Sequence, residues 1–381
     1  AERWPADGLP PNPGAWITTT ARNRAIDRLR RESSRTDRYH AAHLLDGADT
    51  MDLREAHELG LLDDLADVVP DDQLRLIFLC CHPALSADAR VALSLRLIAG
   101  LDVAEIAAAF ATPESTIAKR LVRAKQKLRH NSAPYRIPSP ADLPDRIQVV
   151  LAVVYLVFTE GHRPTAAGPE PVRSDLTDTA IRLGRLLADL MPDEPEAIGL
   201  LALMLLTDAR RPARLDSGGA FVPLADQDRD RWDRTRIVEG HALVRACLRR
   251  NRPGPFQIQA AIAAVHADAD SAAETDWGQI VALYDQLLRF RPDPIVALNR
   301  AVAIGEVAGG AAGLDALDQL DTSAVATFQP YHAVRAGLLR RAGRHGEAVA
   351  AFDRAIELSA NAAERSFLAR ERSDAIDAAD D

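Results

Sequence analysis

Apolar residues recur at intervals of three and four along most of this 381-residue chain, which is the spacing of amphipathic helices. This pattern predicts helices at residues 15–38, 73–82, 87–99, 103–110, 113–129, 147–158, 177–190, 194–207 and 229–249. Alanine, leucine and arginine are abundant and aromatic residues make up only 5% of the chain, a composition that favours helix over sheet. The sequence therefore predicts an all-α fold, which its length divides into about two to four domains.

The most informative stretch is residues 101–130, where a break separates two predicted helices. Asp102 can cap the first helix, and Thr112 and Pro113 suit the N-cap and first position of the second. The apolar side of the first helix consists of Val103, Ile106, Ala107 and Phe110. The second helix has apolar residues at spacings of four, three and four, namely Ile117, Leu121, Ala124 and Leu128. This pattern predicts a helix-turn-helix, whose second helix lies in a DNA major groove.

The face opposite this apolar stripe is polar and basic. From Pro113 to Arg129 the chain holds six lysines and arginines and one acid, and all three lysines of the chain lie here. The residues of this helix that we expect to contact DNA are Ser115, Thr116, Lys119, Arg120, Arg123, Lys125 and Lys127. A solvated basic helix in an ordinary bundle is the alternative interpretation.

A second basic helix is predicted after the Pro/Gly-rich residues 1–14. The pattern from Trp16 to Arg31, W-I-x-x-x-A-R-N-R-A-I-D-R-L-R-R, resembles the promoter-melting helix of region 2 in extracytoplasmic-function sigma factors of bacterial RNA polymerase. Residues 71–130 resemble region 4 of the same family, which reads the −35 promoter element. The order and separation of the two motifs support the resemblance over most of residues 12–130.

The resemblance implies a sigma factor, which brings RNA polymerase core to promoter DNA and opens the DNA duplex there. It implies no catalysis and no cofactor of the protein's own. It implies base-edge contacts in the −35 element from Ser115, Lys119 and Arg123. Phosphate contacts are implied for Arg120, Lys125 and Lys127. The residues implied at the −10 element and the melted strand are Arg22, Asn23, Arg24, Arg28 and Arg31. A conventional helix-turn-helix regulator is the alternative, but it leaves the arginine-rich helix unexplained.

Charge is distributed unevenly along the chain, whose net charge is −9. Residues 1–40 carry +3, residues 41–72 carry −9, residues 73–130 carry +5 and residues 131–381 carry −8. The two basic segments coincide with the two predicted DNA-binding elements. The acidic segment matches the linker between regions 2 and 4, which threads the polymerase cleft in that family. A solvated acidic linker explains its composition almost as well.

The C-terminal third contains a repeat that relates Tyr284, Leu317 and Phe352, at intervals of 33 and 35 residues. Asp268, Ala301 and Ala336 stand sixteen residues before them. The last unit, with Gly343, Ala348, Phe352 and Ala355, matches the tetratricopeptide pattern, and a plain helical bundle is the alternative. The segment from Val154 to Gly161, VYLVFTEG, resembles the extension of a sigma-factor subgroup with a fused C-terminal regulatory domain.

These observations predict five segments. They are a partial region 2 at 1–40, an acidic linker at 41–70, region 4 at 71–131, a helical extension at 132–255, and tetratricopeptide-like repeats at 256–372. We expect the extension to regulate activity and the repeats to offer a groove to a regulatory protein or peptide.

Other candidate chemistry is weak. Cys80, Cys81 and His82 invite a metal site, but no second Cys/His cluster lies at zinc-ligand spacing, so core packing is preferred. Glu160 and His162 could pair catalytically, yet a helix end and turn is the simpler interpretation because no nucleophile or phosphate loop accompanies them. The sparse cysteines and the short apolar run at 147–158 indicate a reduced, cytoplasmic protein without membrane contact.

Overall fold

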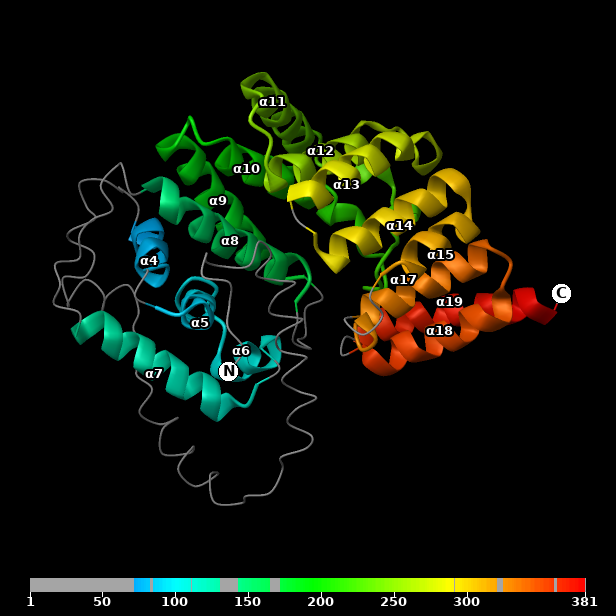
Figure 1. Ribbon diagram of the computed structural model, residues 1–381, viewed down its shortest axis with the longest axis horizontal. Helices are drawn as coiled ribbons and strands as arrows, with labels where there is room; N and C mark the ends of the chain where they lie inside the picture. Colours follow the sequence, from blue (N-terminus) through cyan, green and yellow to red (C-terminus); the bar gives the residue numbers. More distant parts are fainter. Residues whose placement is uncertain are drawn as a thin grey trace, which may run out of the picture. The chain divides into compact units, whose positions relative to one another are not determined.

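The computed structural model describes residues 72–82, 85–110, 112–130, 143–164, 172–290, 292–320, 325–359 and 362–380. Its helices are α4 (Asp72–Cys80), α5 (Ala87–Leu97), α6 (Val103–Ala109), α7 (Glu114–His130), α8 (Leu143–His162), α9 (Ser174–Leu190), α10 (Pro195–Asp208), α11 (Arg234–Arg250), α12 (Pro255–Asp268), α13 (Trp277–Phe290), α14 (Pro294–Ala308), α15 (Gly310–Asp318), α17 (Gln329–Arg341), α18 (His345–Leu358) and α19 (Ala362–Asp380) (Figure 1). In the described ranges β-structure is limited to one isolated bridge between Leu215 and Phe221. The all-α prediction is confirmed, and the predicted helix at 15–38 lies outside the described residues.

Several helix boundaries differ from those predicted, among them those of α8 and α11. Residues 159–162, predicted as a helix end and turn, form the last turn of α8, where the His162 ring stacks on Phe158 with centroids 5.7 Å apart. Helix α11 begins at Arg234 rather than at residue 229, because residues 229–231 form a 3-10 turn. The carboxylate of Asp233 then caps α11 by accepting a hydrogen bond from the backbone N–H of Arg236 at 3.1 Å.

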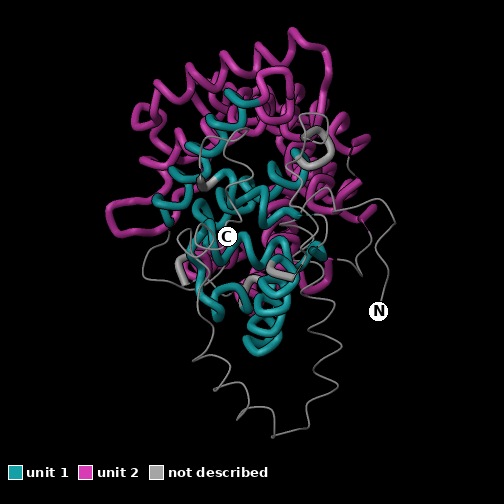
Figure 2. The backbone as a smooth tube through the Cα atoms, turned by 90° about the vertical axis from the view of Figure 1, so that its left-hand side faces the viewer, with its two compact units in different colours: residues 1–166, 172–190 teal, residues 167–171, 191–381 magenta. Residues whose placement is uncertain are grey.

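The helices divide into two compact units, and the first comprises residues 1–166 and 172–190, which include α4 to α9 (Figure 2). Helix α4 is buried over most of its surface, with Leu74, Leu76, Ile77, Phe78, Leu79 and Cys80 all at most 2% exposed. Helices α5, α8 and α9 each pack against it. Because a helix that is apolar all round must be covered all round, α8 and α9 belong to the core of this unit. The five predicted segments, with a division after residue 131, stay a prediction.

The second unit, residues 167–171 and 191–381, is built on α10, which is buried along almost its whole length and packs against α11 and α12. Glu196 near the start of α10 is only 7% exposed. Its carboxylate accepts hydrogen bonds from the backbone N–H groups of Phe256 at 3.0 Å and Gln257 at 3.2 Å. Burial raises the pKa of Glu196, and the hydrogen bonds oppose that rise. This carboxylate caps α12 and fixes it against α10.

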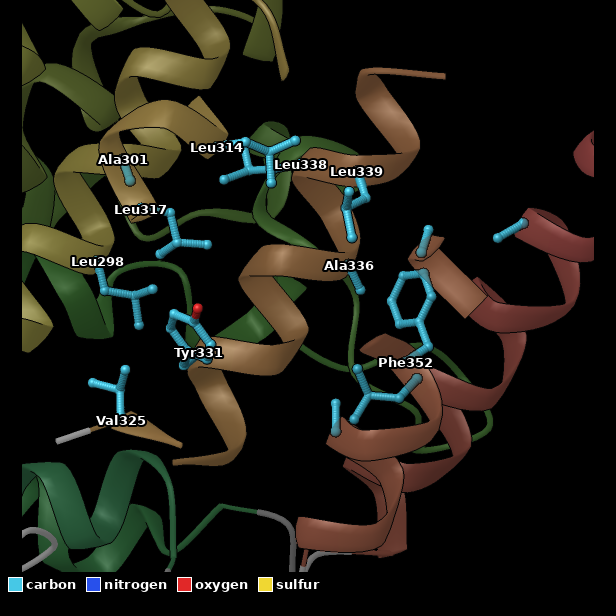
Figure 3. Packing of buried hydrophobic residues seen from close by; sticks show 14 residues of the cluster. Leu298, Ala301, Leu314, Leu317, Val325, Tyr331, Ala336, Leu338, Leu339 and Phe352 are labelled. Carbon is cyan, nitrogen blue, oxygen red and sulfur yellow. The ribbon is translucent and has the colours of Figure 1, made fainter. Parts of the chain in front are cut away.

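Consecutive helices from α12 to α19 pack against one another, and the core cluster of Figure 3 joins the later ones. Leu317 and Phe352, which the sequence repeat places in equivalent positions, are 0% and 2% exposed. The residue after each repeat position is an aspartate that pairs with an arginine of the following helix. The pairs are Asp285–Arg300 at 2.5 Å, Asp318–Arg335 at 2.5 Å and Asp353–Arg372 at 2.6 Å. The three pairs recur with the sequence repeat, although Tyr284 of the first unit is only half-buried, and the assignment to the tetratricopeptide class stays a prediction.

Candidate nucleic-acid interface

The short helix α6 is fixed at its start by a reciprocal pair of hydrogen bonds. The backbone N–H of Glu105 donates to the Asp102 carboxylate at 2.7 Å, and the backbone N–H of Asp102 donates to the Glu105 carboxylate at 2.7 Å. This capping box satisfies two N–H groups that the helix leaves without intrahelical partners. The predicted cap at Asp102 is confirmed.

The turn between α6 and α7 is stabilised by hydrogen bonds to backbone carbonyls of α6 and of the residue that follows it. The backbone N–H of Thr112 donates to the Ala107 carbonyl at 2.9 Å, and the Thr112 hydroxyl donates to the Phe110 carbonyl at 2.9 Å. Thr112 was predicted to be the N-cap of the second helix. Its hydroxyl instead bonds to the C-terminal end of α6. Pro113 immediately precedes α7, and its carbonyl accepts from the N–H of Thr116 at 2.9 Å.

One side of α7 is buried as the spacing predicts. Ile117, Leu121, Ala124 and Leu128 are 0%, 7%, 3% and 2% exposed. This side packs against α5 and α6. Four apolar side chains therefore set the rotation of the helix about its axis, and most of the polar residues between them are turned outward.

Arg120 is the member of the predicted contact set that turns inward. Its guanidinium Nη2 lies 3.1 Å from a carboxylate oxygen of Asp88 on α5, and its Cζ lies 5.1 Å from the centre of the Phe110 ring. Only 15% of the Arg120 side chain is exposed. These contacts tie α7 to α5 and to the end of α6, so a phosphate contact from Arg120 would require them to open.

The outward side of α7 brings together most of the other predicted residues. Thr116, Lys119, Arg123 and Lys127 are exposed, and Ser115 and Lys125 are half-buried beside them. Residues three and four apart share a helix face, so Thr116, Lys119, Arg123 and Lys127 form one row of donors about 17 Å long. Contact of this row with DNA stays a prediction. Arg22, Asn23, Arg24, Arg28 and Arg31 lie outside the described residues.

The helix-turn-helix also contacts the extension, through residues that the sequence pattern does not single out. Arg173, just before α9, has a guanidinium nitrogen 3.6 Å from the Glu105 carboxylate of α6. At the end of α8, a Cβ on Gly161 would lie 2.7 Å from the backbone nitrogen of Thr177, so only glycine permits this approach of α8 to α9. Neither contact has a sequence signal, because both depend on chain segments far apart in sequence.

The second unit contains buried charges that sequence spacing also did not reveal. The carboxylate of Asp208 is fully buried and pairs with Arg211 at 3.3 Å and with Arg236. Arg229 donates to the carbonyls of His266 at 2.6 Å and Ala269 at 2.7 Å. Burial and the nearby arginines lower the pKa of His266 to about 4, so this imidazole is neutral at pH 7. These groups join the segment after α10 to α11 and α12.

The candidate metal residues are packed inside the first unit. Cys80 and Cys81 are buried, as the core-packing interpretation predicts, and burial raises the pKa of the Cys80 thiol well above its ordinary value. Within the ranges that the structure describes, no group of three or more histidine, cysteine, aspartate or glutamate residues is arranged to hold a metal ion. None of the described helices is long and apolar enough to cross a membrane.

Comparison with known families assigns a class to this arrangement. Residues 75–128 match the model of sigma-70 region 4, and residues 146–248 match a family of unknown function, DUF6596. The helix-turn-helix and this match identify a sigma-70 region 4 domain in this part of the chain, which implies a DNA-binding, sigma-factor-like role.

The similarity to one curated protein extends over almost the whole chain. An uncharacterized protein of Rhizobium meliloti (strain 1021) is 44% identical over 367 residues, which cover 96% of this chain and 85% of the relative. The chain therefore belongs to the same family as this rhizobial protein. No solved structure matches it.

Proposed function

We propose that the protein is an alternative sigma factor that directs bacterial RNA polymerase to specific promoters, with α7 lying in the major groove of the −35 element. The observation that supports this most is the outward row of Thr116, Lys119, Arg123 and Lys127, which lies within the match to sigma-70 region 4. The major groove of B-DNA admits one α-helix, and lysine and arginine donate to the acceptors that guanine presents there.

The residues of α7 divide by position. Ser115, Lys119 and Arg123 face base edges and determine sequence preference, whereas Lys125 and Lys127 near the end of α7 neutralise phosphates. Arg120 positions the helix instead, because its guanidinium is engaged by Asp88 and the Phe110 ring. An α7 that is fixed on its domain loses little conformational freedom when it binds, which favours affinity.

The N-terminal segment completes promoter recognition in this proposal. Its basic residues Arg22, Asn23, Arg24, Arg28 and Arg31 contact the −10 element and the strand that is opened. Arginines suit single-stranded nucleic acid because they neutralise phosphates and stack on bases. RNA polymerase core supplies the remaining DNA affinity, which allows a chain with net charge −9 to act at promoters.

The C-terminal unit regulates this activity. A groove of about 520 Å³ lies against α17 and α18. Its lining includes Tyr331, His332, Arg335, Leu339, Glu347 and Arg354. A mixture of apolar side chains and charged side chains of both signs suits a peptide or a regulatory protein, whose binding would change transcription without touching α7.

The test is transcription with purified RNA polymerase core and the whole chain, on templates selected from a random promoter pool. We expect defined start sites that depend on the chain, and a Lys119→Ala variant that shifts the preferred base at one position. Arg370→Ala, at an exposed position on α19, is the matched control. A chain that binds DNA without core and supports no initiation would instead be a conventional regulator, and the sigma-factor proposal would fail.

A further inference from the structure

Arg229, in the 3-10 turn before α11, lies at the centre of a basic cluster in the second unit. Its guanidinium carbon lies 4.6 Å from the centre of the Trp232 ring, and its Nη1 donates to the His266 carbonyl of α12 at 2.6 Å. The His266 ring in turn meets the Trp277 ring of α13 edge to face, with centroids 5.2 Å apart. The turn, α12 and α13 therefore bring a guanidinium, an imidazole and two indoles together.

Arg210, the second residue after α10, belongs to the same cluster. The backbone N–H of Asp233 donates to the Ala209 carbonyl at 2.9 Å, and the 3-10 turn that follows Arg210 packs against the one that contains Arg229. Burial and the nearby charge of Arg229 lower the pKa of Arg210 to about 10. The same two arginines contribute to the lowered pKa of His266. Each of these cationic groups therefore disfavours the charge of the others.

The two arginines of the cluster lack carboxylate partners. In the described part of the chain, neither Arg210 nor Arg229 lies within ion-pair distance of an acid, although Arg229 is only 9% exposed. Burial lowers the pKa of Arg229, and the exposed acids Asp270 and Glu274 oppose this shift from beyond ion-pair distance. The buried Asp208 of the same unit, by contrast, pairs with two arginines. The Arg210–Arg229 pair thus holds positive charge that the folded chain does not neutralise.

Trp232 adds a donor without an acceptor. The residue is 3% exposed, and within the described ranges its buried indole N–H donates to no acceptor. An indole nitrogen can only donate, and a donor that has left water without gaining a partner disfavours folding. Water or an anion can act as the acceptor, and the two arginines beside Trp232 favour the anion.

The charge of the cluster favours phosphate among the common anions. A phosphate group carries a charge of about −1.5 to −2 near neutral pH, so it neutralises two guanidiniums at once, whereas a carboxylate neutralises one. The planar fork of an arginine also fits two phosphate oxygens together. Arg210 and His266 are half-buried, so solvent reaches the cluster.

We propose that Arg210, Arg229 and Trp232 bind a phosphate group, either as the free ion or as part of a small phosphate ester. The two guanidiniums pair with its oxygens, and the indole N–H of Trp232 donates to one of them. The bound phosphate joins the end of α10 to the turn before α11 and so stabilises the second unit. All the residues of this site belong to the second unit, so phosphate binding does not depend on DNA binding by α7.

Thermal unfolding of the full chain tests the site, with inorganic phosphate as the probe. At about 10 mM phosphate and constant ionic strength, we expect the unfolding temperature to rise, because a ligand that binds only the native state stabilises it. Arg210→Gln should abolish this rise. Without phosphate, Arg210→Gln should unfold at the same or a higher temperature than the wild-type chain, because the repulsion by Arg229 is removed. Arg245→Gln, at an exposed position on α11, is the matched control and should keep the rise.

The variant without phosphate separates a ligand site from a purely structural role. A structural arginine would leave Arg210→Gln less stable in both buffers, with the phosphate-dependent rise intact. That result would overturn the proposal. No rise in the wild-type chain, or an equal rise with acetate in place of phosphate, would overturn it as well.

Tryptophan fluorescence locates the bound phosphate. The chain has four tryptophans, and the variant Trp4→Phe/Trp16→Phe keeps only Trp232 and Trp277, which both lie in the cluster. We expect phosphate to change the emission of this variant in a saturable way, and Arg210→Gln in the same background to weaken binding by about tenfold or more. Unchanged emission, with a raised unfolding temperature, would place the phosphate elsewhere and refute the assignment.

A comparison of probes distinguishes the two sources of phosphate. Tighter binding of glycerol phosphate than of inorganic phosphate, in the same fluorescence titration, identifies a site for an ester. Tighter binding of inorganic phosphate identifies a site for the free ion. Binding of neither compound contradicts the proposal.

The imidazole of His266 gives a further readout. Burial and the two arginines lower its pKa to about 4, and a bound phosphate removes the second cause, so the pKa of His266 should rise toward its ordinary value. NMR titration of the full chain with labelled histidine, with and without phosphate, measures this pKa, and His266→Gln assigns the signal. A pKa of His266 that saturating phosphate leaves unchanged would show that no phosphate lies between these arginines.

Discussion

Helices α7 and α11 share length and charge but differ in what they expose. Each has 17 residues, and each carries five or more basic residues against one acid. Among the described residues α7 exposes no large apolar side chain, whereas α11 exposes Val238 and Leu248. A wholly polar basic face suits a polyanion such as DNA, whereas exposed apolar side chains offer phosphates no contact. Charge alone therefore does not distinguish the two kinds of surface.

The surroundings of the two helices account for the difference. Helix α7 follows a short helix and a tight turn, and four apolar residues on one side fix its rotation against α5 and α6. Helix α11 follows a 3-10 turn and is capped by Asp233, and a Cβ on Gly240 would lie 2.6 Å from the Leu206 side chain of α10. Both are firmly positioned, so the identity of the outward residues decides what each helix binds.

The largest expected effect tests the burial assigned to the two helices. Leu121→Ala should lower the free energy of unfolding of the first unit by about 2–5 kcal/mol, because it removes apolar contacts and leaves a cavity. Val238→Ala on α11 removes an exposed side chain and should change the free energy of unfolding by less than about 0.5 kcal/mol. Thermal and urea unfolding of the full chain measure both. Equal losses in the two variants would mean that one of the helices is rotated from its assigned orientation.

The next effect tests the division of α7 into base and phosphate contacts. Lys119→Ala should cost about 1–3 kcal/mol of DNA binding at one promoter position and relax the base preference there. Lys127→Ala should weaken binding to all sequences. It should also reduce the slope of log affinity against log salt concentration by about one, because one fewer phosphate is neutralised. Binding titrations at several salt concentrations check both. Equal and sequence-independent losses would show that Lys119 does not face the bases.

A smaller effect tests the inward position of Arg120. Arg120→Ala should lower the free energy of unfolding by about 1 kcal/mol, through loss of the Asp88 pair and the contact with the Phe110 ring. A double-mutant cycle with Asp88→Ala should show that the two side chains stabilise each other, so that the double variant loses less stability than the sum of the two single variants. If Arg120→Ala leaves stability unchanged but reduces the salt dependence of DNA binding, Arg120 contacts phosphate after all.

The smallest effect concerns the buried thiol of α11. Burial raises the pKa of Cys247 to about 11, so the thiol is protonated at pH 8 and iodoacetamide should label it very slowly in the native chain. A pKa that is higher in the folded state makes stability decline as the pH rises from the unfolded value toward 11. Labelling of urea-unfolded chain is the control. Rapid native labelling at pH 8 would place Cys247 at the surface and reverse the inner and outer sides of α11.

Features encoded by nearby residues could be predicted from the sequence. The cap at Asp102, the stripe from Ile117 to Leu128 and the all-α fold depend on spacings of three or four residues, and all three are confirmed. The inward turn of Arg120 was not predicted, because it depends on the position of Asp88 some thirty residues earlier. The 3-10 turn at 229–231 was missed for a similar reason, since Arg229 is held by carbonyls about forty residues later in the chain.

The membership of α8 and α9 in the first unit bears on how this protein could be divided or recombined. A chimera that exchanged only residues 75–128 would separate the helix-turn-helix from two helices that pack against α4 and would break the Arg173–Glu105 pair. The smallest exchangeable cassette therefore ends at Leu190. The DUF6596 match, at residues 146–248, begins inside this cassette and ends beyond it. The boundaries of the sequence family therefore do not coincide with the boundaries of the packed unit.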